Sequence, residues 1–127
     1  MMSEKQDLHL VEWLRRIQLS WELDLEKLSK LCHVDQSVLK HFLDMSSAEV
    51  SELPSIPTGL ESAVALVGIY RRVSTVYKTP EEQNQWLTRA NSVFEGNRPI
   101  DVMSMSPDHL AYVSYTVESG LRLGGQE

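Results

Sequence analysis

The chain has 127 residues, of which 42% are hydrophobic and 24% charged, and its formal net charge is −6. This length fits one domain, or two very small ones that share a core. The composition excludes a collagen-like, disulfide-dense or wholly disordered chain, and no apolar run approaches the roughly 20 residues of a membrane-spanning helix. The acidic first residues are unlike a signal peptide, and Cys32 is the single cysteine. We therefore expect a cytoplasmic protein with no membrane partner.

The charge balance restricts the ways in which the chain could bind nucleic acid. Residues 1–58 hold 10 acidic and 6 basic side chains, a net −4, and residues 59–127 hold 8 and 6, a net −2. A nucleic-acid-binding domain usually shows a basic balance or a basic stripe. Any DNA contact must therefore come from a local patch or from a symmetric dimer.

Residues 8–45 show the three- and four-residue apolar spacing of amphipathic helices. The stripes at 10–21, 25–31 and 38–45 predict three helices. Asp35 is a suitable N-cap for the third helix. His33 stands where the turn of a helix-turn-helix usually has glycine, and histidine can adopt the left-handed conformation that this position needs.

The second and third of these helices have the pattern of a helix-turn-helix, because apolar positions 28, 31, 34, 39 and 42 pack two helices at a steep angle. Glutamine suits an adenine edge, and lysine suits guanine or phosphate. Asp35 and Asp44 on the same helix would repel phosphate. The alternative is a three-helix subdomain that binds no DNA. The candidate DNA contacts are Gln36, Ser37, Lys40 and His41, and Arg15 and Arg16 are candidates for contact with the DNA backbone.

Residues 46–58 are rich in serine and contain Pro54 and Pro57, which disfavour a helix. We read residues 51–58 as a linker between an N-terminal part, 1–50, and a C-terminal part, 59–127. A longer helix is expected over residues 60–77, with apolar residues on more than one face. Such a helix is buried on several sides. Val67, Tyr70 and Val73 are therefore candidate residues of a homodimer interface, and packing within the chain is the alternative.

Two later helix starts are strongly marked. Thr79 precedes Pro80, and Glu82 completes a capping box. Ser106 and Pro107 repeat the cap-proline start before the last helix. No alternating strand pattern of useful length is present, so we expect an all-α fold.

Signals of catalysis are weak. Cys32, His33 and His41 are the nearest approach to a metal-binding group, and no second cysteine or histidine pair completes a tetrahedral set. The chain contains none of the common nucleotide-binding, hydrolase or zinc-protease motifs. We expect neither an enzyme nor a bound metal or cofactor.

Residues 86–103 carry the most specific pattern in the chain: Trp86-Leu87, then Asn91, Gly96 and a helix start at Pro99. This pattern resembles the signature of the Xre/MbcA/ParS toxin-binding domain, and residues 8–45 are similar to the Xre-type helix-turn-helix that commonly precedes it. Without the family, the same residues specify only core anchors, a turn and a helix start.

The match departs from the usual family pattern at two positions. Ala90 stands where proline is often found, and Glu95 stands where the family often has a second glycine.

The resemblance implies an N-terminal helix-turn-helix bundle joined to a small helical toxin-binding domain. It implies a homodimeric antitoxin of a type II toxin–antitoxin system, which neutralises a cognate toxin, often of the NAD-consuming RES type, and represses its own operon. In the family the antitoxin's C-terminal end lies at the toxin's active-site cleft. The corresponding residues here are Arg122, Gly124, Gly125, Gln126 and Glu127.

Three alternatives stay open. The chain could be a stand-alone DNA-binding regulator, or a non-DNA-binding adaptor with a vestigial helix-turn-helix. In the third, the last seven residues are a frayed end, and the inhibitory surface lies on helix 107–120 instead.

Overall fold

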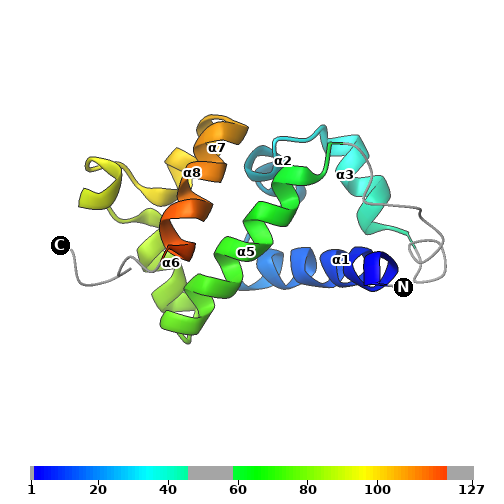
Figure 1. Ribbon diagram of the computed structural model, residues 1–127, viewed down its shortest axis with the longest axis horizontal. Coiled ribbons are helices and arrows are strands. Elements are labelled where there is room, and N and C mark those ends of the chain that lie inside the picture. The colour runs from blue at the N-terminus through cyan, green and yellow to red at the C-terminus, as the bar shows by residue number, and fades with distance from the viewer. Residues whose placement is uncertain (1, 46–58, 120–127) are drawn as a thin grey trace.

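The structure, a computed structural model, describes residues 2–45 and 59–119, and for residues 2–9 the backbone alone. The fold is all-α, as predicted (Figure 1). None of the described helices is long and apolar enough to cross a membrane. The elements are α1 (Met2–Trp21), α2 (Leu25–Cys32), α3 (Gln36–Leu43), α5 (Glu61–Val76), α6 (Pro80–Thr88), a 3-10 turn η1 (Ser92–Phe94), α7 (Pro99–Met105) and α8 (Pro107–Glu118).

The predicted helix starts are confirmed by their hydrogen bonds. The side chains of Asp35, Thr79 and Ser106 each accept a bond from a first-turn backbone N–H, at 3.1, 3.2 and 3.1 Å respectively. The Glu82 carboxylate in turn accepts a bond from the Thr79 backbone N–H, which completes the capping box. A cap of this kind contributes about 1 kcal/mol to helix stability, so these short helices begin at positions that their own sequence sets.

The central helix α5 contacts α1, α2 and α8. Figure 1 shows it crossing the middle of the molecule, with α1 on one side and α8 on the other. Val67, Tyr70 and Val73, the expected dimer-interface residues, are at most 8% exposed within the single chain. The chain's own helices supply this burial, which agrees with the alternative of packing within the chain, and a role of these residues in a dimer stays a prediction.

The two predicted parts of the chain share one hydrophobic core. The indole N–H of Trp21 on α1 donates to the Gln83 side-chain oxygen on α6 at 3.0 Å. The Ser20 and Tyr70 hydroxyls lie 3.0 Å apart, which joins α1 to α5. The predicted linker, 51–58, lies outside the described residues.

The turn between α2 and α3 is built on His33. Its φ of 53° is left-handed, as the sequence predicted. Its ring nitrogen Nε2 lies 2.7 Å from the Met103 carbonyl oxygen on α7. A carbonyl can only accept a hydrogen bond, so Nε2 carries the proton in this contact. His33 thus closes the turn and also ties it to the C-terminal half.

Substitution of His33 separates these two roles. His33→Ala loses the bond to Met103 and keeps an unfavourable left-handed φ, so we expect the free energy of unfolding to fall by about 1 kcal/mol. His33→Gly loses the same bond but adopts that φ freely, so it should be more stable than His33→Ala by about 1 kcal/mol. Denaturant unfolding measures both values. Equal stability of the two variants would contradict the left-handed turn.

Candidate functional site

The outer face of α3 carries the predicted DNA-contacting side chains. Gln36, Ser37, Lys40 and His41 are all exposed. The opposite face of α3, with Leu39, Phe42 and Leu43, is buried. The structure therefore brings these four polar residues together on one accessible surface.

Two of these four residues have acidic partners on the same surface. The Lys40 ammonium lies 2.7 Å from an Asp44 carboxylate oxygen, and the Ser37 hydroxyl donates to Asp35. The bonds from Ser37 hold the pKa of Asp35 below its usual range, and the bond from Lys40 does the same for the pKa of Asp44. Both carboxyls are consequently ionised at neutral pH, and they would repel phosphate.

Arg15 and Arg16 do not act on one surface. The Arg15 guanidinium donates to the Leu43 carbonyl at the end of α3. The Arg16 guanidinium instead lies over the Trp13 ring, 4.8 Å from its centroid. Consecutive helical residues point about 100° apart. The structure places Arg15 beside α3 and Arg16 beside Trp13, and their contacts with a DNA backbone stay predictions.

The motif residues of the C-terminal half have structural roles. Trp86 and Leu87 are core residues, and Pro99 is buried at the first turn of α7. Gly96 has a φ of 85°, which favours glycine. Its N–H donates to the Asn91 carbonyl at 2.9 Å.

Asn91 is the centre of this turn. Its side chain is buried and accepts from the Val93 N–H at 2.9 Å, which starts η1. Its backbone N–H donates to the Asn97 carbonyl at 3.2 Å. Glu95 has a φ of 58°, a left-handed residue that the sequence analysis did not identify. Glu95 occupies the position where the family that this pattern resembles often has glycine. That correspondence could have predicted a left-handed residue here.

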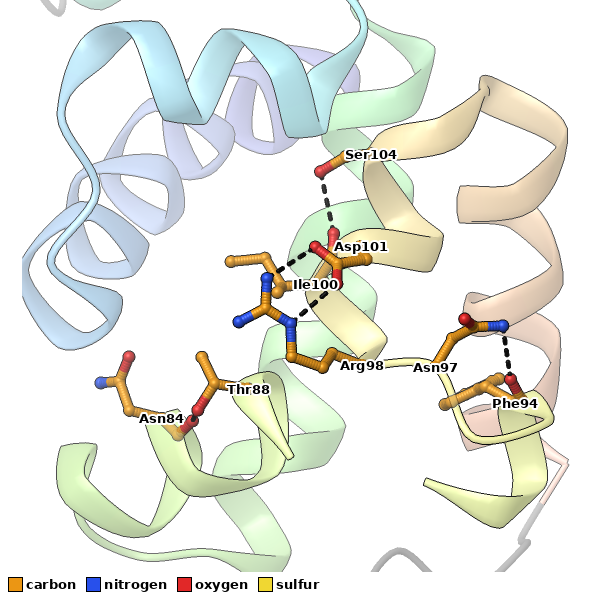
Figure 2. A network of polar contacts seen from close by, with 8 residues as sticks. All are labelled: Asn84, Thr88, Phe94, Asn97, Arg98, Ile100, Asp101 and Ser104. Atoms are coloured by element: carbon orange, nitrogen blue, oxygen red, sulfur yellow. Dashed lines mark hydrogen bonds and ion pairs between the residues drawn. The ribbon is translucent and has the colours of Figure 1, made fainter. Parts of the chain in front are cut away.

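Side-chain bonds around this turn are local (Figure 2). Arg98 holds Asp101 with two bonds, of 2.7 and 3.0 Å, and this contact lowers the pKa of the Asp101 carboxyl. The Asn97 amide donates to the Phe94 carbonyl at 3.0 Å, and Ser104 donates to the Ile100 carbonyl at 2.8 Å. These bonds join residues three or four apart, so they shape a turn and a helix start.

A hollow of about 490 Å³ lies between η1, α7 and α8. Phe94, Met105 and Tyr112 contribute its apolar lining, and Glu95 and Asp108 contribute carboxylates. The rings of Phe94 and Tyr112 meet edge to face at 6.1 Å. Asp108 and Tyr112 belong to helix 107–120, which was one predicted alternative for the inhibitory surface, whereas Phe94, Glu95 and Met105 were not predicted to form a surface.

Large apolar side chains are exposed on α7 and α8, and two of them, Met105 and Tyr112, line this hollow. Met105 is 56% exposed, Tyr112 51% and Tyr115 73%. Tyr112 and Tyr115 are three residues apart, so they lie on one face of α8. They fall outside the buried stripe of Leu110 and Val113. This position relative to the stripe could have predicted from the sequence that both tyrosines are exposed. We call Tyr112 and Tyr115, together with Met105 at the end of α7, the α8 aromatic face.

The described part of the chain contains no group of three histidine, cysteine, aspartate or glutamate side chains that could hold a metal ion. Burial raises the pKa of the Cys32 thiol to about 12. The thiol is therefore protonated at neutral pH, and the nucleophilic thiolate form is suppressed.

No protein-family model matches the chain, and no curated protein matches it. The resemblance at residues 86–103 thus stays a prediction from the sequence. The predicted toxin-binding residues at 122–127 lie outside the described residues, of which the last is 119. The α3 face and the α8 aromatic face both lie within the described residues.

The ion pair between Lys40 and Asp44 gives a test of DNA binding at α3. Asp44→Asn removes a carboxylate that holds Lys40 and repels phosphate. A duplex that binds α3 should therefore bind about three- to tenfold tighter to this variant at about 50 mM salt. Glu26→Gln is the matched control, because Glu26 pairs with Lys30 at the same i,i+4 spacing on α2. Fluorescence anisotropy measures both. Equal affinities would contradict a role for α3.

Proposed function

We propose that the chain is the antitoxin of a type II toxin–antitoxin system, which binds and neutralises a cognate toxin protein. The observation that carries this proposal is the α8 aromatic face, in which Met105 and Tyr112 line the hollow and Tyr115 is 73% exposed. This face lies in the half of the chain whose sequence resembles a toxin-binding domain.

Interface chemistry supports a protein partner for this face. Tyrosine and methionine are enriched in protein–protein interfaces, where tyrosine buries a large ring and keeps its hydroxyl hydrogen-bonded. The apolar lining of the hollow can receive a side chain of the partner. Glu95 and Asp108 at the hollow favour a basic partner surface, and the net charge of −6 would accelerate the encounter with it.

The proposal divides binding into two parts. The α8 aromatic face supplies affinity, and residues 122–127 supply inhibition at the toxin's active site. By the resemblance, the toxin is of the RES type and consumes NAD, whereas the antitoxin itself carries out no reaction. Homodimerisation stays a prediction, and so does a role in it of Val67, Tyr70 and Val73, which are buried within the single chain.

Autoregulation through α3 belongs to the same proposal, with Gln36 and Lys40 directed at an operator. The second candidate is an adaptor that binds a protein and no DNA. The ion pair between Lys40 and Asp44 favours this adaptor, since it neutralises the α3 lysine before any phosphate arrives. A stand-alone regulator is the third reading, and it needs no toxin partner.

Substitution on the α8 aromatic face tests the toxin-binding proposal. Tyr115→Ser should weaken binding to the toxin by about 30-fold, the effect of losing about 2 kcal/mol at an interface anchor. Leu19→Ser is the matched control, because Leu19 is an apolar residue on α1 that is 82% exposed. Co-purification and calorimetry with the product of the neighbouring reading frame measure the change. Equal affinities of the two variants would show that this face is not used.

Deletion of residues 121–127 tests the second part. The buried core of the described chain extends to Val117, so the truncated protein should keep its fold and its circular dichroism spectrum. We expect it to retain part of its toxin binding and to lose growth rescue in cells that express the toxin. Full rescue would place inhibition on α8 alone.

A further inference from the structure

Two arginines from different helices each place a guanidinium group over the ring of one tryptophan, Trp13. The Arg16 guanidinium on α1 lies 4.8 Å from the Trp13 ring centroid, and the Arg71 guanidinium on α5 lies 5.2 Å from it. Arg72 follows Arg71 on α5, and all three arginines are exposed. We call Arg16, Arg71 and Arg72, with Trp13, the arginine cluster.

These arginines differ from other basic side chains of the protein. Lys30, Lys40 and Arg98 each form an ion pair with an acid on their own or the adjoining helical turn. Within the described side chains, no such pair includes Arg16 or either α5 arginine. In a chain of net charge −6, the arginine cluster thus gathers three guanidinium groups, against the two carboxylates, of Glu12 and Glu118, that share its hollows.

The surface around the cluster is hollowed. Two hollows, of about 440 and 370 Å³, share Trp13 and Arg71. Arg72 lines the first hollow and Arg16 the second. Glu118 and Glu12 stand one in each hollow, and neither forms an ion pair with the cluster among the described contacts. The cluster is consequently open to an extended ligand across two helices.

Stacking on the Trp13 ring orients the guanidinium groups in a way that suits phosphate binding. A guanidinium over an indole ring keeps its N–H edges free, and these edges match phosphate oxygens in pairs. Trp13 is itself fixed, because its ring meets Tyr70 edge to face at 6.0 Å. Two of the three arginines are therefore partly oriented before a ligand arrives, which reduces the entropy lost on binding.

We propose that the arginine cluster binds the phosphate backbone of a nucleic acid. The open arrangement on two helices suits successive phosphates of a strand better than a single enclosed phosphate. The cluster is separate from the α3 face, because Arg15 turns toward Leu43 while Arg16 turns toward Trp13. The site does not rest on the toxin-binding proposal, and its test uses no toxin.

The test is binding of a labelled duplex of random sequence to the full chain, followed by fluorescence anisotropy across a salt series. Arg71→Gln and Arg72→Gln should each weaken binding about tenfold at about 50 mM salt and lower the salt slope by about one. Arg98→Gln is the control, since it makes the same charge change at an arginine that pairs with Asp101. It should bind like the unaltered protein. Circular dichroism confirms that each variant is folded.

A second measurement reads the site directly. Trp21 and Trp86 are each 2% exposed, so the neutral quencher acrylamide reaches Trp13 first. The duplex should protect this fluorescence, and Arg71→Gln should remove the protection.

Four results would overturn the proposal. The first is no duplex binding at low salt. The second is equal loss in Arg71→Gln and Arg98→Gln, and the third is a loss confined to Lys40→Gln. The fourth is protection of Trp13 by inorganic phosphate, or by a poly-glutamate peptide, at concentrations equal to those of the duplex phosphates.

Discussion

The packing of two tryptophans against Tyr70 is the contact on which the other parts of the molecule depend. Trp13 and Trp21 meet the Tyr70 ring edge to face, at 6.0 and 5.5 Å. Such pairs contribute about 0.5–1.5 kcal/mol each beyond the area that they bury. This contact fixes α1 on α5. It also holds Trp13 within reach of two arginines and brings the Trp21 indole to Gln83 on α6.

The sequence predicted the features that depend on near neighbours. The caps at Asp35, Thr79 and Ser106 act on backbone groups within three residues, so their position in the chain identifies them. The turn at His33 was predictable for the same reason, because the left-handed residue stands directly between two apolar stripes.

The sequence did not predict features that depend on distant neighbours. Arg16 and Arg71 meet at Trp13 although 55 positions separate them, and no local pattern links them. Tyr70 was a candidate for a dimer interface as well as for packing within the chain. Both were open because periodicity shows that a face is buried but does not show what buries it. The partner helix α8 follows α5 only after two other helices.

The charge of the whole chain conceals a difference between its surfaces. The hollow beside α8 contains the carboxylates of Glu95 and Asp108, and the arginine cluster contains three guanidinium groups. A net charge of −6 describes neither surface. Because charges more than about 8–10 Å apart are largely screened at physiological salt, each surface selects its ligand by its own composition.

The bond from His33 to Met103 has a thermodynamic consequence for α7. This helix has seven residues, and it carries Met103 at the bond and Met105 at the hollow. A ligand that seats against Met105 and holds α7 in place also stabilises the turn that precedes α3. Linkage makes the effect reciprocal, so a ligand that orders this turn strengthens binding at the hollow by the same factor. Two residues near the C-terminal end of this short helix, Met103 and Met105, thus couple the hollow to the turn between α2 and α3.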